Sequence, residues 1–251
     1  MGLRRLETSI SDAYANLALE EAIFTLNEGR TVRVWRNERS VIIGRAQLAK
    51  FETDMEYCES ERIPVVRRFT AGGAVYNGPG NLNWSIFLKN GSAVGKTGVP
   101  DGARGVFRTS ASIIVEVLRR LGIEARLEEP NRIVTDEGKV SGMAAYLSRE
   151  RVLCHGTLLL RANLEEAAAL TSPKRIQLEQ KYVRSRETRM ANLGIKESSF
   201  TRSLWEVLRD SADEDSELDE LSGEELQLAG RLTKYRDTDW NLGDPFKVNL
   251  N

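Results

Sequence analysis

The stretch from Arg67 to Tyr76 constrains the fold more than any other part of this sequence. It places two arginines before the pair Gly72-Gly73, between an apolar run at 63–66 and a second glycine turn at 77–80. A glycine loop lets backbone N–H groups approach an anion closely, and arginine adds planar donors for the same oxygens. The residues after it, 74–76, are strand-like and not helical, which excludes a P-loop and a dinucleotide-binding fingerprint. We therefore predict a phosphate-bearing ligand on a loop carried by a sheet.

Hydrophobic periodicity predicts helices and strands that do not alternate regularly. Helices are expected at 11–27, 53–60, 106–121, 164–170, 201–209 and 223–235. Strands are expected at 31–35 and 40–43, joined as a hairpin, and at 63–66, 81–88, 124–127 and 151–161. Ser9 or Ser11 is the expected cap of the first helix. This order favours an α+β protein with mixed or mostly antiparallel sheets and flanking helices over a doubly wound sheet.

Composition narrows the class of partner and the compartment. The 251 residues allow one large domain, and the net charge of -1 argues against a dedicated nucleic-acid binder. From Phe200 onward 13 acidic residues accompany 6 basic ones, a net charge of -7, so the rest of the chain is mildly basic. A basic body suits an acidic ligand or an acidic protein partner, although an acidic surface helix is the simpler interpretation of the C-terminal part. Two cysteines and no long apolar run disfavour a zinc site, a disulfide framework, secretion and membrane insertion, so we predict a cytoplasmic protein.

Two further side chains are candidates for chemistry. Lys139 stands between Gly138 and the run 140–142, where it could point inward as a point charge on a phosphate or carboxylate. A solvated lysine in a turn is the more frequent case. His155 follows Cys154 in a strand, so the two side chains point to opposite faces and cannot form a nucleophile pair. A lone histidine in a strand is usually structural.

Five segments, taken in order, resemble the lipoate–protein ligases of the A type, within the biotin/lipoate ligase superfamily. They are 35–47 (WRNERSVIIGRAQ), 67–76 (RRFTAGGAVY), 80–83 (GNLN), 139–144 (KVSGMA) and 155–159 (HGTLL). Asn131 stands where the family has an asparagine before the lysine segment. The segment at 67–76 is more similar to the lipoate branch than to the biotin ligases, which makes a biotin ligase the weaker alternative.

The resemblance implies a class II aminoacyl-tRNA synthetase-like biotin/lipoate ligase fold and a two-step reaction. Lipoate would attack the α-phosphate of ATP, with Mg²⁺, to give lipoyl-AMP and pyrophosphate. A lysine of an acceptor lipoyl domain would then take the acyl group and release AMP.

The resemblance also implies roles for particular residues. Lys139 is the expected catalytic residue, because adenylylation brings two anions together, and no metal-ligating residue is expected. The residues expected to bind the nucleotide or lipoyl-AMP are Arg68, Gly72, Gly73, Ala74, Val75, Tyr76, Asn81, Asn83, Lys139, Gly142, Ala144, His155 and Thr157. Candidates for the apolar slot of the lipoyl tail are Trp35, Val41 and Leu158.

Two departures from the family pattern put full activity in doubt. The first glycine of the usual triplet is Ala71, which would cost on the order of 1 kcal/mol if that position needs φ > 0. The His-Asp pair that usually follows the signature is Asn77-Gly78. A non-catalytic lipoate- or nucleotide-binding subunit is therefore one alternative.

The expected organisation is one catalytic domain over residues 1–251, with an acidic helical extension at 200–251 packed on it in place of a full accessory domain. Some small relatives need a separate accessory protein, so this chain is a candidate for needing one. Another alternative is an octanoyl- or lipoyl-transferase of the same fold, which works through a cysteine thioester. We disfavour it because no cysteine stands between 128 and 138 and Cys154 lies in a strand.

Overall fold

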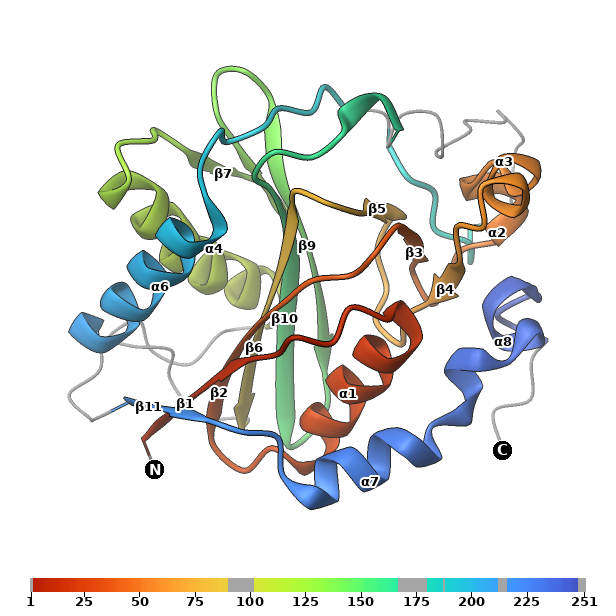
Figure 1. Cartoon of the computed structure of the whole chain (residues 1–251), viewed down its shortest axis with the longest axis horizontal. Helices are drawn as coiled ribbons and strands as arrows, with labels where there is room; N and C mark the ends of the chain where they lie inside the picture. Colours follow the sequence, from red (N-terminus) through yellow and green to blue (C-terminus); the bar gives the residue numbers. More distant parts are fainter. Residues whose placement is uncertain (1, 90–101, 167–179, 187, 212–215, 248–251) are drawn as a thin grey trace.

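The computed structural model describes residues 2–89, 102–166, 180–186, 188–211 and 216–247. Within these residues the centre is an eight-stranded sheet in the order β11-β1-β2-β6-β10-β9-β8-β7 (Figure 1). In chain order its strands are β1 (Leu3–Glu7), β2 (Arg30–Trp35), β6 (Asn81–Lys89), β7 (Arg126–Glu128), β8 (Arg132–Val134), β9 (Lys139–Leu147), β10 (Arg151–Leu159) and β11 (Ser216–Asp219). Strand β1 pairs in parallel with β2 and β11, and the other neighbours are antiparallel, as the predicted α+β class requires.

A smaller sheet carries the arginine and glycine loop. It consists of β4 (Val65–Arg67), β3 (Ser40–Ile43) and β5 (Val75–Asn77), with β3 parallel to β4 and antiparallel to β5. The expected hairpin between 31–35 and 40–43 is therefore wrong, because β2 and β3 belong to different sheets. The reason is burial on both faces of β3. Val41 and Ile43 pack in one apolar cluster and Ile42 packs in another, so β3 lies in the centre of its own sheet.

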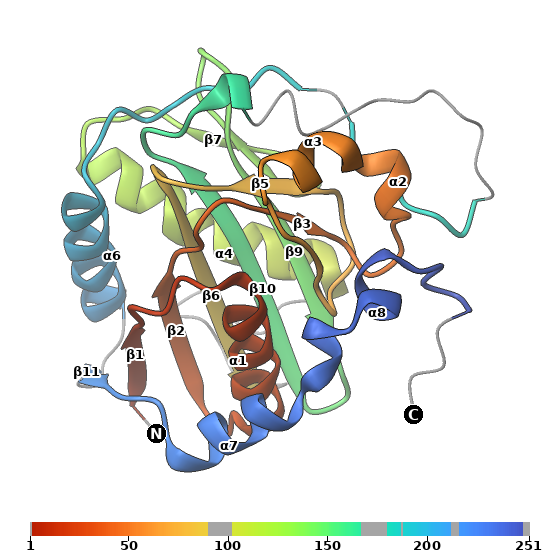
Figure 2. The same ribbon diagram turned by 45° about the vertical axis from the view of Figure 1, so that its right-hand side comes forward.

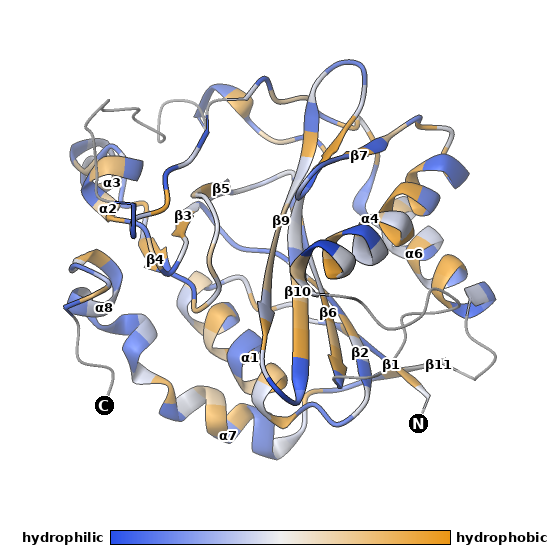
Figure 3. Ribbon diagram, turned by 180° about the vertical axis from the view of Figure 1, so that it is seen from behind, coloured by the Kyte–Doolittle hydropathy of each residue, from blue (hydrophilic) through white to orange (hydrophobic). Residues whose placement is uncertain are grey.

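Helices cover both faces of the large sheet (Figures 1 and 2). On one face lie α4 (Gly102–Arg120) and α6 (Glu197–Ser211), and Ile114 of α4 packs with Trp84 of β6. On the other face lies α1 (Ala13–Leu26), whose Ile23 packs with Phe87 of β6. Trp84 and Phe87, three positions apart on β6, thus point to opposite faces of the sheet and pack in different apolar clusters. Figure 3 shows hydrophobic residues along β10 and toward the end of β6.

The remaining helices lie at the edges. They are α2 (Ala49–Glu52), α3 (Met55–Ser60), α7 (Gly223–Arg231), the 3₁₀ helix η1 (Thr233–Arg236) and α8 (Thr238–Leu242). The cap expected for α1 is wrong. Asp12 caps it by accepting a hydrogen bond from the Ala15 amide at 2.7 Å, whereas the Ser11 hydroxyl donates to Glu38. The helix expected at 164–170 falls partly outside the described residues.

The C-terminal part returns to the start of the chain. Strand β11 pairs with β1, α7 packs on α1, and α8 contacts β4. Arg4 of β1 forms ion pairs with Asp219 and Glu225, each at 2.6 Å. Neither β1 nor β11 was expected from the sequence. Among the described helices, none is both long and apolar enough to cross a membrane.

Candidate active site

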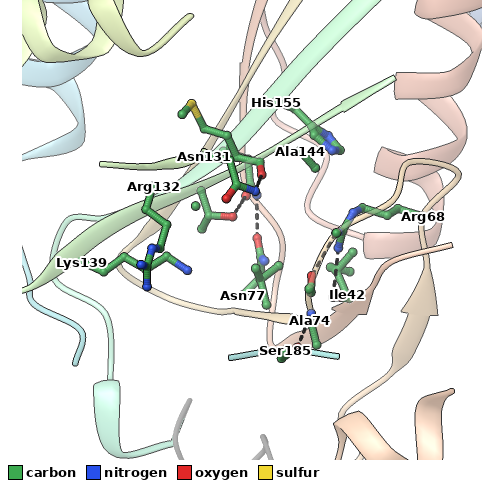
Figure 4. A pocket seen from close by; sticks show the side chains of 18 of the residues that line it. Ile42, Arg68, Ala74, Asn77, Asn131, Arg132, Lys139, Ala144, His155 and Ser185 are labelled. Carbon is green, nitrogen blue, oxygen red and sulfur yellow. Dashed lines mark hydrogen bonds between the residues drawn. The ribbon is translucent and has the colours of Figure 1, made fainter. Parts of the chain in front are cut away.

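The described residues form a cavity of about 360 Å³ between the glycine loop and strands β8, β9 and β10 (Figure 4). This volume is in the range of small-molecule sites. Its cationic lining residues are Arg68, Arg132, Lys139, Arg184 and Arg186. No Asp or Glu is found among the described residues that line it. Such a lining favours a ligand that carries several negative charges.

Lys139, at the start of β9, lies beside Arg132 of β8 in the cavity wall (Figure 4). Its ammonium forms no hydrogen bond or ion pair with other parts of the described chain. Burial, followed by the charge of Arg132, lowers the pKa of Lys139 from its ordinary value. Arg132 donates to the Thr188 hydroxyl at 3.1 Å and pairs with Glu128 at 3.0 Å, so its position is fixed. The two cations together suit a phosphate or a carboxylate.

Arg68 lies under the glycine loop, and its N–H groups donate mainly to residues of that loop. Its Nε donates to the Thr70 hydroxyl at 3.0 Å, and its Nη2 donates to the carbonyl oxygens of Ala71 and Gly73, both at 2.9 Å. Burial lowers the pKa of Arg68 to about 10. Arg68 does line the cavity, as the sequence suggested. In this structure its hydrogen bonds shape the loop that faces the cavity.

Arg67 does not belong to the cavity, so the initial pairing of both arginines with an anion is wrong. Its side chain is fully buried and donates to the carbonyl oxygens of Gln47, Trp240 and Gly243, at 2.5, 2.6 and 3.0 Å. The position alternates with Arg68 along the chain and therefore faces the other way. Arg67 joins α8 to the loop after β3.

The glycine loop needs a glycine at one position and tolerates alanine at another. Gly72 has φ +108°, and a β-carbon there would lie 2.8 Å from Arg68 Nη2. Ala71 is not among the described residues with a positive φ; the single non-glycine residue of that kind is Arg62. The strain considered for Ala71 is therefore absent.

The segment 182–186 covers the loop from outside and was not singled out in the sequence. The Ser185 hydroxyl accepts a hydrogen bond from the Ala74 amide at 2.8 Å (Figure 4). Glu52 of α2 holds the segment, because it accepts from the Ser185 amide at 3.0 Å and pairs with Arg184 at 2.9 Å. The available signal was the density of basic residues, which are Lys181, Arg184, Arg186 and Arg189.

Amide and hydroxyl groups line the cavity beside the cations. Asn83 donates to the Asn77 side-chain oxygen at 2.7 Å and accepts from the Thr157 hydroxyl at 3.2 Å. Asn77 thus takes part in the site although it departs from the family pattern. Asn131 donates to the Met143 carbonyl at 2.6 Å and so joins the loop before β8 to β9.

Eleven of the thirteen residues expected to bind nucleotide or lipoyl-AMP line this cavity. The two that do not are Tyr76, whose hydroxyl donates to Glu166 at 2.7 Å, and Asn81. His155 lines the cavity, but both of its ring nitrogens already have partners in the protein.

The apolar part of the wall differs from the expectation. Trp35 lines the cavity as expected, together with Leu17 and Ile42. Val41 and Leu158 are fully buried in apolar clusters away from it, so those two assignments are wrong. Residue alternation is the reason, since Ile42 points to the face opposite Val41.

Comparison with known proteins places these features in a family context. The model of the lipoyl protein ligase A/B catalytic domain matches residues 12–202. The Bacillus subtilis lipoate-protein ligase LplJ is 30% identical over 97% of this chain and 74% of its own length.

Solved structures agree over nearly the whole chain. A Thermoplasma acidophilum lipoate protein ligase with bound lipoic acid superposes with a TM-score of 0.81 and 27% identity, covering 97% of this chain and 100% of the other. A chain from a structure of a bi-partite lipoate protein ligase and its E2 lipoyl domain, from the same organism, superposes with a TM-score of 0.82 and 26% identity, covering 100% of this chain and 98% of the other. A lipoate-protein ligase A bound with ATP superposes with a TM-score of 0.82 and 27% identity, covering 97% of this chain and 99% of the other.

Proposed function

Because the chain belongs to the lipoyl protein ligase A/B catalytic domain family, and is a ligase enzyme, we propose that it activates lipoate with ATP and transfers the lipoyl group to a protein lysine. The observation that carries this proposal is Lys139, an ammonium without a partner among the described residues, in a cavity lined by cations opposite a glycine loop. Relatives solved with lipoic acid and with ATP support both substrates.

In the first step a lipoate carboxylate oxygen attacks the α-phosphorus of ATP, and the bond to pyrophosphate breaks. Negative charge accumulates on the phosphoryl oxygens during this step, so fixed cations near them lower the barrier. Lys139 and Arg132 lie side by side in the cavity wall, and we assign them this role. In the second step the acceptor's lysine ε-amine attacks the acyl carbon of lipoyl-AMP, and AMP leaves with the bonding electron pair.

The two kinds of wall suit the two parts of lipoyl-AMP. The charged wall of β8 and β9 suits the phosphate, whereas Leu17, Trp35 and Ile42 offer apolar surface for the lipoyl tail.

The donor set does not fit a metal ion held by the protein. Mg²⁺ prefers carboxylate and water oxygens in octahedral geometry. The described lining contains no carboxylate, and the neutral amide oxygens of Asn77, Asn83 and Asn131 do not supply the negative charge that Mg²⁺ prefers in its ligands. Among the residues that the structure describes, no group of three His, Cys, Asp or Glu could hold a metal ion. We propose that Mg²⁺ is carried by the phosphates of the nucleotide and not by side chains of the protein.

We also propose that residues 1–251 form one catalytic unit that needs a separate accessory subunit for full activity. The packing of α7 on α1 and the pairing of β11 with β1 support the first part. The bi-partite ligase from Thermoplasma acidophilum supports the second part, because a chain of that structure, and the relative named lipoate-protein ligase A subunit 1 from the same organism, match this chain along nearly their whole length.

A transferase that works through a cysteine thioester lacks support in this structure. Cys58 and Cys154 are both buried and neither lines the cavity. Burial raises the pKa of Cys58 to about 11 and that of Cys154 to about 12, so both stay as unreactive thiols.

The test is a reaction of the purified chain with ATP, lipoate and an acceptor lipoyl domain. Mass spectrometry follows lipoyl-AMP, and a coupled assay follows pyrophosphate. We expect lipoyl-AMP formation to be lost in the Lys139→Ala variant. A second reaction includes the candidate accessory subunit. Lipoylation that persists in the Lys139→Ala variant would overturn the site, and full adenylylation by the chain alone would overturn the need for an accessory subunit.

A further inference from the structure

A series of hydrogen bonds crosses the protein behind the cavity and passes through Glu20 of α1. The indole N–H of Trp35, in the cavity wall, donates to the Ser85 hydroxyl at 2.9 Å. The Ser85 hydroxyl donates to Glu20 Oε1 at 2.6 Å. The other carboxylate oxygen of Glu20 lies 2.8 Å from His155 Nδ1.

From His155 the series continues to the glycine loop. His155 Nε2 lies 2.8 Å from the Thr70 hydroxyl, which also accepts a hydrogen bond from Arg68 Nε at 3.0 Å. Arg68 in turn holds the carbonyl oxygens of Ala71 and Gly73. One buried carboxylate is therefore connected both to the indole of the apolar wall and to the loop that faces the ligand.

The donors at the two ends favour one arrangement of the protons in the series. The indole of Trp35 and the guanidinium of Arg68 carry only donors, so the hydroxyl oxygen next to each must accept. The hydrogen of each hydroxyl is then available to donate inward, from Ser85 to Glu20 on one side and from Thr70 to His155 on the other. His155 accepts at Nε2 and donates from Nδ1 to the carboxylate. In this arrangement every polar hydrogen of the series has a partner.

The carboxylate form of Glu20 suits this arrangement. Burial alone would raise the pKa of Glu20, but His155, Ser85 and Arg33 together outweigh it and the pKa is lowered. Glu20, Ser85 and Thr70 are fully buried, so water cannot replace a lost partner. The hydroxyl, imidazole and carboxylate lie in the order of a nucleophile triad. Thr70 is not a nucleophile, however, because it is inaccessible and its oxygen accepts from Arg68.

We propose that Glu20 is a positioning residue for nucleotide binding, which acts on the glycine loop through His155, Thr70 and Arg68. The carboxylate holds His155 in the Nδ1–H form, His155 orients the Thr70 hydroxyl, and Thr70 fixes the guanidinium that shapes the loop. The kinetic part of this proposal rests on the proposed function, whereas the proton arrangement does not.

Replacing Glu20 by Gln shows why the charge matters. The amide must turn its NH₂ group either to His155 or to Ser85. Toward His155 it forces the Nε2–H form and leaves the Thr70 hydrogen without a partner. Toward Ser85 it leaves the Ser85 hydrogen without one. In each orientation one buried hydroxyl hydrogen is left without an acceptor, although glutamine has the same shape as glutamate.

The first experiment is ¹⁵N NMR of the single histidine of the chain, labelled selectively and observed at about pH 8. Since His155 is the sole histidine, its assignment needs no further variant. We expect a protonated Nδ1 and an unprotonated, hydrogen-bonded Nε2. An Nε2–H form in the wild-type chain overturns the proposal, and this result does not depend on catalytic activity.

The second experiment is calorimetry with ATP on four variants, each first shown to fold by its unfolding temperature. We expect Thr70→Val and Glu20→Leu each to weaken ATP binding by about tenfold or more, because leucine, unlike glutamine, cannot keep the hydrogen bond to His155, and we expect the double variant to be no weaker than either one. Ser85→Ala, which removes a hydroxyl on the other side of Glu20, should leave ATP affinity within about twofold. Additive effects, or an equal loss in Ser85→Ala, overturn the proposal. Absence of ATP binding in the wild-type chain would instead contradict the proposed function, and the NMR result would still decide the proton arrangement.

Discussion

Gly142 lies directly beneath the side chain of Lys139, since a β-carbon at position 142 would come within 2.9 Å of Lys139 Nζ and 3.0 Å of its Cε. Real β-carbons do not approach other atoms that closely, so any larger residue must displace the lysine. Glycine at this point of β9 therefore leaves the space in which the lysine lies toward the cavity.

Replacing Gly142 by Ala should lower kcat for lipoyl-AMP formation by about tenfold or more, because the displaced ammonium no longer meets the reacting phosphate. Folding should be largely kept, since the atoms that give way belong to the end of a flexible side chain. Pyrophosphate release measures kcat, and urea unfolding measures stability. Gly230→Ala in α7 is the matched control, because its β-carbon meets nothing within 4 Å. An unchanged kcat in Gly142→Ala would show that the position of Lys139 is not critical.

The lowered pKa of Lys139 predicts a pH dependence with a definite sign. A lysine with a lowered pKa loses its proton at a lower pH than free lysine does, so kcat/KM should fall on the alkaline side before about pH 10.5. The Lys139→Arg variant keeps its positive charge over this range. Its kcat/KM should therefore be lower than that of the wild type but should not fall on the alkaline side. Rates of pyrophosphate release against pH, for both proteins, test this. The same limb in Lys139→Arg would assign it to another group.

Lys139 should affect stability in the opposite direction, so that the free energy of unfolding rises with pH where kcat/KM falls. In the window between its lowered folded pKa and the ordinary value near 10.5, the unfolded chain binds a proton that the folded chain does not. Stability should therefore rise with pH across that window. Denaturant unfolding of wild type and Lys139→Met at several pH values isolates this contribution.

Arg67 and Arg68 illustrate what the sequence could and could not predict about the site. The sequence located the glycine loop and, through the family resemblance, about half of the residues that line the cavity. It could not separate the two arginines, whose partners lie on distant segments. Arg68 holds the loop itself, whereas Arg67 binds carbonyl oxygens of α8 more than 170 residues away.

Replacing Arg67 by Met should therefore destabilise the fold without acting through the cavity. Several buried carbonyl oxygens would lose their donor, at a cost of at least about 3 kcal/mol in the free energy of unfolding. Chemical denaturation measures this cost. Arg45→Met, at an exposed position in the adjoining loop, should change stability by less than about 0.5 kcal/mol. Equal effects of the two substitutions would contradict the role of Arg67.

The topology was predictable only where pairing is local or periodicity is strong. The long helix α4 and the strand β10 were located because their apolar patterns are regular. Strands β1 and β11 were missed, since Leu3 pairs with Ser216 and the acidic residues around β11 hide its strand character. The segment 182–186 was missed for a similar reason, because its place is set by Glu52 and Ala74 and not by its own sequence.

Ala71 is expected to be neutral in spite of its departure from the family pattern. It has no positive φ, so restoring the glycine triplet with Ala71→Gly relieves no strain. We predict a change in kcat/KM of less than about twofold and a small loss of stability from added unfolded-state freedom. Gly72→Ala is the contrasting variant, since φ +108° and the 2.8 Å approach to Arg68 both oppose a β-carbon. It should lower ATP affinity strongly, as calorimetry would show. A marked gain of activity in Ala71→Gly would mean that the loop adopts another conformation during the reaction.

The buried thiols separate a ligase from a transferase that uses a cysteine nucleophile. Thioester chemistry needs a thiolate that reaches the substrate, whereas Cys154 packs in the core beside α4 and Cys58 packs in the small-sheet cluster. The double variant Cys58→Ala/Cys154→Ala should therefore keep kcat for lipoylation within about twofold, while its stability falls by about 1–3 kcal/mol because two small cavities form. Iodoacetamide at about pH 8 should label the folded wild-type chain slowly, since raised pKa values keep both sulfurs protonated. Mass spectrometry of the protein after acid quenching provides the direct control. An acyl group attached to either cysteine, or loss of lipoylation in a folded double variant, would favour the transferase.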